Sequence, residues 1–230
     1  MVGNALLDYY NNSYTTDIKV KSSISEDDVV SIPYMFRTEE ELPQLEKKAL
    51  TLCKGKVLDV GAATGCHSII LKERGLDVEA IDISKGAVEV MQKRGVNVQN
   101  ANFFDAIGKY DTLLFLMNGL GIAESLKKLP KFLEKAKSLL NEGGQMLLDS
   151  SDIRYMFEEE DGSMWVDLNV SYYGEVTYQM EYKGLVTDKF DWLFVDFKKL
   201  KEVATTLGLK TELLYEDENN QYLVKLSSFR

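Results

Sequence analysis

The sequence of 230 residues is poor in the residues that build metal sites and disulfide frameworks. It has two cysteines, three prolines and a single histidine. Cys53 and Cys66 form no C-x-x-C pair, and His67 is adjacent to Cys66, so these two side chains cannot easily chelate one metal ion. The sequence therefore predicts reduced thiols, no bound metal and a cytoplasmic location.

Long apolar runs and positive charge are also scarce. Apolar stretches such as 112–117 are too short to cross a bilayer, and the N-terminal residues lack the basic and apolar regions of a secretory signal. The formal net charge is −10 at pH 7, and no run of Lys and Arg interleaved with aromatics is present. We therefore expect no membrane span and no nucleic-acid partner, since phosphates repel an acidic surface. A small-molecule substrate is expected, and monomer and homodimer both stay open.

Strand-like and helix-like segments alternate between residues 39 and 151. Segment 110–118 has a continuously apolar centre, LLFLM, which is typical of a strand covered on both faces. This alternation indicates βαβ units, a parallel sheet and helices on both of its faces. The expected strands are 56–60, 77–83, 96–102, 110–118 and 145–150, and the expected helices are 64–74, 84–94 and 124–140, preceded by a helix within 39–53.

The C-terminal part has a different pattern. Apolar and polar residues alternate over 166–172 and 176–182, which predicts an antiparallel hairpin. This hairpin is expected to serve as a lid, an edge extension or a dimer surface. A helix over 197–207 and a strand pair, 210–215 and 222–227, should complete the fold.

The predicted fold is therefore an α/β, doubly wound, Rossmann-like sheet that is mostly parallel and has an antiparallel C-terminal strand. We expect one domain, 1–230. It would contain an N-terminal helical extension (1–38), a cofactor-binding core (39–151), and the hairpin insert with the C-terminal α/β completion (152–230).

The stretch VLDVGAATG joins a predicted strand to a glycine-containing turn and a helix. Gly61 and Gly65 would let a ligand approach the backbone. The dinucleotide pattern G-x-G-x-x-G is not matched, because Ala63 stands in the middle, and Asp59 would repel a pyrophosphate. A ligand with a cationic end suits Asp59 better, and the zwitterionic, sulfonium-bearing S-adenosylmethionine has this chemistry. Asp82, at the end of the next strand, could accept hydrogen bonds from ribose hydroxyls.

Three segments, VLDVGAATG, IDIS and LLNEGGQMLLDSSD, resemble the motifs of class I S-adenosylmethionine-dependent methyltransferases. The resemblance covers about residues 52–151. It implies that Asp59 orders the methionine end, that Asp82 holds the ribose and that Ile83 packs against adenine. Asn102 stands where the family usually has Asp, so that either Asn102 or Asp105 could contact the adenine. The cofactor-binding residues implied are Asp59, Gly61, Ala62, Ala63, Gly65, Asp82, Ile83, Asn102, Phe103, Met117 and Asn118.

The sequence indicates the residues that bind the methyl acceptor less clearly. Family members that modify nucleic-acid bases carry Asn-Pro-Pro-aromatic after the fourth strand, whereas this chain has Asn-Gly-Leu-Gly from Asn118, which argues against base methylation. Arg37, Asp149 and Asp152 are candidate substrate contacts. No catalytic residue is assigned, because methyl transfer from a good leaving group can rely on orientation. Two alternatives remain: an NAD(P)-dependent oxidoreductase and a non-catalytic protein that binds S-adenosylmethionine.

Overall fold

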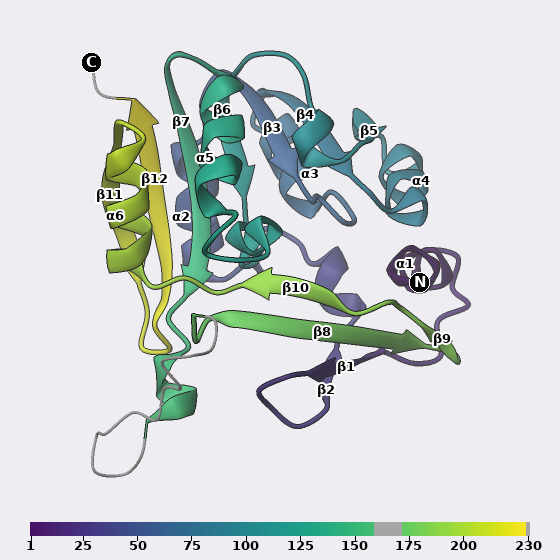
Figure 1. Ribbon diagram of the computed structural model, residues 1–230. Coiled ribbons are helices and arrows are strands. Elements are labelled where there is room, and N and C mark those ends of the chain that lie inside the picture. Colours follow the sequence, from purple (N-terminus) through teal and green to yellow (C-terminus); the bar gives the residue numbers. More distant parts are fainter. Residues whose placement is uncertain (159–171, 229–230) are drawn as a thin grey trace.

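The computed structural model describes residues 1–158 and 172–228. Its larger sheet has seven strands in the order β11-β12-β7-β6-β3-β4-β5 (Figure 1). Strand β12 runs opposite to the other six strands of this sheet. The predicted doubly wound, mostly parallel sheet with an antiparallel C-terminal strand is therefore confirmed. The strands are β3 (Lys56–Val60), β4 (Asp77–Asp82), β5 (Val98–Asn100), β6 (Tyr110–Phe115), β7 (Leu140–Ser151), β11 (Leu209–Glu216) and β12 (Gln221–Ser228).

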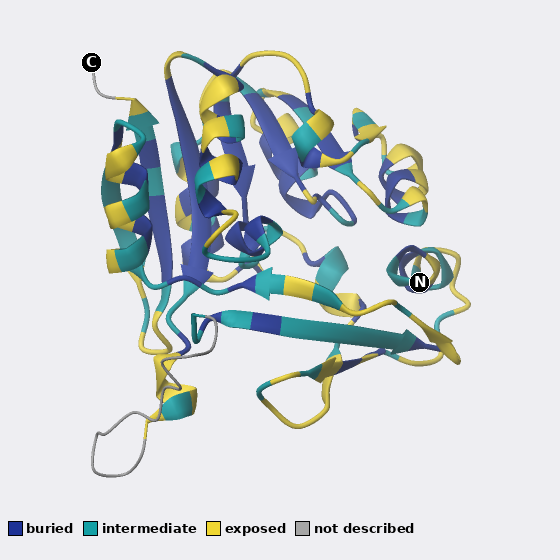
Figure 2. Cartoon of the chain, viewed as in Figure 1, coloured by how far each residue is buried: buried dark blue, intermediate teal, exposed yellow. Residues whose placement is uncertain are grey.

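Different helices cover the two faces of this sheet. Leu113 and Phe115 of β6 pack with α5 (Leu129–Ser138) and α6 (Phe197–Thr206). Leu114, between them, faces the other way and packs with α2 (Gln44–Leu52) and α3 (Cys66–Glu73). This alternation follows from the two-residue period of a strand. Figure 2 accordingly shows the central strands buried on both faces.

Some elements are shorter than their sequence patterns predict. Strand β6 ends at Phe115 because Met117 and Asn118 adopt left-handed backbone angles, with φ of 64° and 56°. The helix expected over 124–140 is α5 alone, which has Pro130 in its first turn, where proline is well accommodated. A separate 3-10 turn, η3 (Gly119–Ala123), occupies the loop before it. Within the described residues, no helix is long and apolar enough to cross a membrane.

A second, smaller sheet joins segments that are far apart in the sequence. Its order is β10-β8-β1-β2, and β9 (Leu185–Val186) also pairs with β8. Figure 1 shows this sheet lying across the end of the larger sheet at which β6 and β7 terminate. Its strands are β1 (Ile18–Ser22), β2 (Asp28–Val30), β8 (Glu175–Tyr182) and β10 (Phe190–Leu193).

The structure describes only part of the expected hairpin. Of segment 166–172, residues 166–171 lie outside the described residues. The other arm is strand β8, and its two edges pair with β1 and β10: Met180 is opposite Val20, and Val176 is opposite Trp192. The β8 strand is thus the centre of the smaller sheet.

The N-terminal segment, which was expected to be a helical extension, contains strands as well as helices. Besides β1 and β2, it forms α1 (Val2–Tyr10) and the 3-10 turn η1 (Pro33–Phe36). Helix α1 packs on α4 (Lys85–Lys93) through two glycines: a Cβ atom at Gly3 would lie 2.8 Å from the Cα of Gly86. This contact brings α1 to the end of β4.

Candidate functional site

The turn after β3 is held to the neighbouring strand by the Asp82 carboxylate. One oxygen of Asp82 accepts a hydrogen bond from the backbone N–H of Ala63 at 3.0 Å, and the other accepts one from Ser84 at 2.8 Å. Gly61, Ala63 and Gly65 have φ angles of 71°, 52° and 76°. Ala63 is not a glycine, so this left-handed backbone conformation is unfavourable for it. The flanking glycines and the hydrogen bond to Asp82 maintain it.

The two glycines of this turn have different surroundings. A Cβ atom at Gly65 would lie 2.9 Å from Val96 and 3.1 Å from Met91, so this glycine allows the turn to pack on the structure beneath it. At Gly61 the nearest atom to such a Cβ is 3.7 Å away, in Ile122. Gly61 thus leaves open space above the turn, on the side where a ligand can approach.

Asp59, near the end of β3, is a buried carboxylate that faces this space. It is 2% exposed, and the Ser68 hydroxyl donates a hydrogen bond to it at 2.7 Å. Burial raises the pKa of the Asp59 carboxyl above its usual value. No salt bridge within the described residues neutralises it. A cationic ligand group would therefore be stabilised here.

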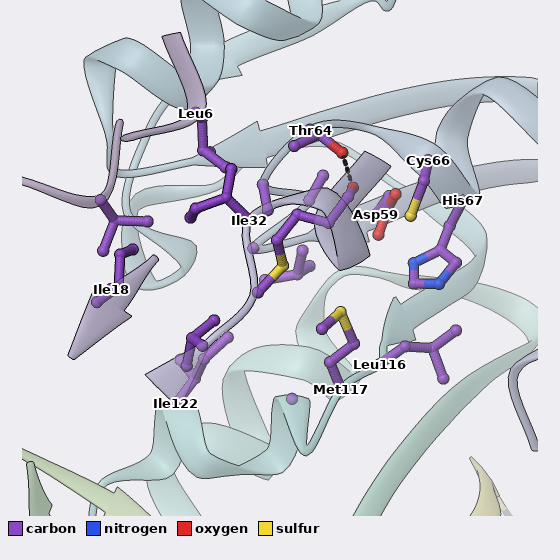
Figure 3. A pocket seen from close by; sticks show the side chains of 18 of the residues that line it. Leu6, Ile18, Ile32, Asp59, Thr64, Cys66, His67, Leu116, Met117 and Ile122 are labelled. Atoms are coloured by element: carbon purple, nitrogen blue, oxygen red, sulfur yellow. Dashed lines mark hydrogen bonds between the residues drawn. The ribbon is translucent and has the colours of Figure 1, made fainter. Parts of the chain in front are cut away.

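A cavity of about 260 Å³ opens beside Asp59. Figure 3 shows Asp59, Thr64 and His67 on one side, Leu6, Ile18 and Ile32 on the other, and Met117 below Asp59. The Thr64 hydroxyl donates a hydrogen bond to the carbonyl oxygen of Met35. The cavity thus lies between the carboxyl end of the larger sheet and the N-terminal segment. Among the predicted cofactor residues, Asp59, Gly61, Ala62, Ala63 and Met117 line it.

A second cavity of about 280 Å³ adjoins the first. Val30, Met117, Met180 and Trp192 line both cavities. The predicted residue Asn118 lines the second one, where it accepts a hydrogen bond from the Ser151 hydroxyl at 2.8 Å.

Gly121 in η3 makes room for the tryptophan at this junction. A Cβ atom at Gly121 would overlap the indole of Trp192. The Gly-x-Gly loop after β6 is therefore more than a turn, because the bare backbone of Gly121 sets the position of the Trp192 ring.

The structure moves several predicted residues away from both cavities. Phe103 is 3% exposed and belongs to the core, with ring centroids of Phe115 and Phe132 at 5.2 and 5.1 Å. Its side chain therefore lines neither cavity, contrary to expectation. Asn102 caps a 3-10 turn by accepting a hydrogen bond from the N–H of Phe104. Ile83 is 73% exposed, beyond Asp82.

The candidate substrate residues Asp149 and Asp152 line neither cavity. Asp149 is fully buried and accepts hydrogen bonds from the N–H of Gly119 at 3.2 Å and from Gln221 at 3.0 Å. Burial raises its pKa to about 6. Asp149 therefore stabilises the loop after β6 through a buried hydrogen bond and does not lie at the entrance of the site. Asp152 accepts hydrogen bonds from the N–H of Arg154 and the hydroxyl of Tyr173.

Arg37 belongs to a buried cluster that sequence reasoning did not find. Its guanidinium donates to both Glu46 carboxylate oxygens at 2.6 and 2.5 Å, and His67 Nε2 lies 2.6 Å from Glu46 Oε2. Burial alone would raise the pKa of Glu46, but hydrogen bonds from His67 and Arg37 hold it below its usual value. Arg37 therefore contacts Glu46 and does not line the cavities, whereas His67 reaches the first one. No pattern in the sequence connects these three residues.

The relatives of the chain identify its family. A family model described as a methyltransferase domain matches residues 36–202. The chain belongs to this methyltransferase family. A S-adenosylmethionine-dependent methyltransferase from Bacteroides fragilis, solved with S-adenosyl-L-homocysteine, is 42% identical, with a TM-score of 0.93 over 99% of this chain and 94% of that one. The chain is thus a S-adenosylmethionine-dependent methyltransferase, which confirms this prediction over the oxidoreductase alternative.

More distant relatives agree on the fold. An uncharacterized methyltransferase of Staphylococcus carnosus is 26% identical over 170 residues, which cover 72% of this chain and 75% of that protein. The CcbJ methyltransferase of Streptomyces caelestis shares 14% identity and a TM-score of 0.62, over 84% of this chain and 92% of that one. At 14% identity, the similarity between CcbJ and this chain shows a shared fold only.

Proposed function

We propose that this methyltransferase transfers the methyl group of S-adenosylmethionine to a small-molecule acceptor held in the second cavity. The observation that carries the proposal is the shared wall of the two cavities. Val30, Met117, Met180 and Trp192 contact both spaces, so a donor in the first and an acceptor in the second would meet beside these side chains.

Asp59 and Gly61 in the first cavity, and Asp82 and Ile83 outside its lining, offer groups that fit the cofactor. Asp59 is a buried carboxylate whose pKa is raised by burial, so a ligand ammonium would relieve its desolvation cost. Gly61 leaves space above the turn. Each Asp82 oxygen accepts one backbone N–H and retains a lone pair for a ribose hydroxyl. Ile83 offers an exposed apolar surface to the adenine. When bound, the cofactor supplies a methyl group on a sulfonium, with a neutral thioether as leaving group.

The chain's own contribution is positioning. Holding donor and acceptor in one orientation can supply much of the rate acceleration for a displacement of this kind. Met117 stands at the junction with a left-handed backbone, between Asp59 and the acceptor side. Asp149 holds the loop that carries it, through the N–H of Gly119.

The acceptor is proposed to be small because the second cavity has a volume of about 280 Å³. A nucleic acid is disfavoured by the net charge of −10. Cys53 and Cys66 are both free thiols, which supports the proposed cytoplasmic location.

Calorimetric titration with S-adenosylhomocysteine tests the cofactor site. We expect micromolar or tighter binding to the wild type and no binding of NAD. Asp59→Asn should weaken the affinity by about 100-fold, because it removes a charge-assisted hydrogen bond in a buried site. Its thermal stability at pH 7 should not fall, since burying the ionised carboxylate is costly.

Asp77→Asn, at the exposed start of β4, is the matched control and should bind normally. Binding that is unchanged in a folded Asp59→Asn variant would remove Asp59 from the site. An absence of binding to the wild type would contradict the proposed function.

A further inference from the structure

The second cavity is lined largely by one face of the smaller sheet. Side chains alternate between faces along a strand, and cross-strand partners share a face. Ser22 of β1 is opposite Tyr178 of β8, and Tyr178 is opposite Phe190 of β10. All three residues line the cavity. The exposed Lys19 and Lys21 occupy the alternate positions of β1 and are not part of this lining.

The lining of this cavity has charge of one sign only. Among the described residues around it, Asp28 is the one carboxylate, and there is no Lys, Arg or His. Asp28 is exposed at the start of β2 and accepts a hydrogen bond from the N–H of Val29 at 2.7 Å. Asp28 and Tyr178 line the same cavity, and the charge of Asp28 adds to the burial that raises the pKa of Tyr178.

Four aromatic side chains, Tyr178, Phe190, Trp192 and Phe194, form part of the remaining wall. The ring of Tyr178 lies 6.0 Å from that of Phe190 and 6.4 Å from that of Phe194, and Phe190 lies 6.5 Å from Trp192 at an angle of 83°. The faces of aromatic rings attract cations, and a nearby carboxylate adds to that attraction. A carboxylate or phosphate ligand would meet repulsion from Asp28 and no compensating cation.

We propose that the acceptor of this methyltransferase is a primary or secondary amine with an apolar, planar body, whose ammonium group is held by Asp28 and the aromatic wall. The inference rests on the proposed function and names the substrate class of the same site. Asp28 lies two positions before Val30, which lines both cavities, so an amine that Asp28 attracts would lie near their junction. Its apolar part would contact the rings of Tyr178, Phe190 and Phe194.

The corresponding reaction is N-methylation. The ammonium first loses one proton to the solvent at the exposed rim. The nitrogen lone pair then forms the new N–C bond while the S–C bond of S-adenosylmethionine breaks, and sulfur keeps the electron pair of that bond. The methylated product carries the positive charge on nitrogen, so Asp28 stabilises the product as well as the substrate.

Three probes with the same body and different head groups test this inference: 3-phenylpropylamine, 3-phenylpropanol and 3-phenylpropionate. Their binding is measured by calorimetry on the full chain with saturating S-adenosylhomocysteine. We expect the amine to bind at least about tenfold more tightly than the alcohol, and the carboxylate to bind most weakly. Mass spectrometry with S-adenosylmethionine should detect N-methylation of the amine.

Asp28→Asn should abolish the preference for the amine over the alcohol, whereas Asp27→Asn, at the exposed neighbouring position outside the lining, should retain it. Equal binding of amine and alcohol by the wild type, tighter binding of the carboxylate, or a preference that survives Asp28→Asn would each overturn the proposal. So would an absence of binding by all three probes. Normal binding of S-adenosylhomocysteine in the same experiment would leave the proposed function intact, and its loss would overturn that function separately.

Discussion

The two sheets of this methyltransferase are built from the sequence in different ways. In the larger sheet, β3 pairs with β4, which is the next strand along the chain, through one short helix. In the smaller sheet, β1 (Ile18–Ser22) pairs with β8 (Glu175–Tyr182), after almost the whole cofactor-binding core has intervened. The larger sheet therefore depends more on local segments, and the smaller sheet depends on contacts between distant ones.

The two sheets should therefore respond differently to substitution, one mainly in stability and the other mainly in ligand recognition. Two carboxylates of the larger sheet, Asp59 and Asp149, are buried, whereas Asp28 of the smaller sheet is exposed. Substitutions in the larger sheet should therefore change folding and cofactor affinity. Those on the smaller sheet should change acceptor affinity.

The largest expected effect is a pH dependence of stability caused by Asp149. Burial raises its pKa to about 6, so the folded protein binds this proton more tightly than the unfolded chain does. The free energy of unfolding should fall by about 3 kcal/mol as the pH rises from about 4 to about 6, and should then level off. Urea unfolding of the wild type and of Asp149→Asn between pH 4 and 7 measures this as the difference between the two proteins. A difference that does not vary with pH would show that Asp149 titrates normally.

The two glycines of the turn should differ in the kind of effect they produce. Gly65→Ala combines a left-handed backbone with a Cβ that would lie 2.9 Å from Val96, and we expect a loss of about 2 to 3 kcal/mol of stability. Gly61→Ala should cost about 1 kcal/mol, because only the backbone strain applies. Its affinity for S-adenosylhomocysteine should nevertheless fall about tenfold, since the new methyl group enters the ligand space. Chemical denaturation and calorimetry on both variants give the two comparisons.

The smallest expected effect comes from the junction of the two cavities. Gly121→Ala should displace Trp192 and weaken the binding of 3-phenylpropylamine about tenfold, with a smaller change for S-adenosylhomocysteine. A double-mutant cycle with Trp192→Ala identifies the route of the effect. If Gly121 acts through the indole, the double variant should bind as Trp192→Ala alone does. Additive losses would show an independent role for Gly121.

The strands of the larger sheet could be predicted because their information is local. Apolar runs bounded by glycines located β3 and β4 to within a residue or so, and the acid-glycine turn located one wall of the first cavity. The opposite wall of the first cavity could not be predicted, because no short sequence pattern indicates that Ile18 and Met180 lie close together. The motif placed Phe103 beside the cofactor, but its ring fills a space between Phe115 and Phe132 that exists only once three segments pack together.

The alternation of the smaller sheet also has a consequence for redesign of the enzyme. Tyr178 and Phe190 line the second cavity only, whereas Met180 and Trp192 line both. A library restricted to Tyr178 and Phe190 would explore new acceptors while every side chain around Asp59 stays as it is. Substrate range in this chain can therefore diverge by exchange of a few residues on one sheet face, without a matching loss of cofactor use.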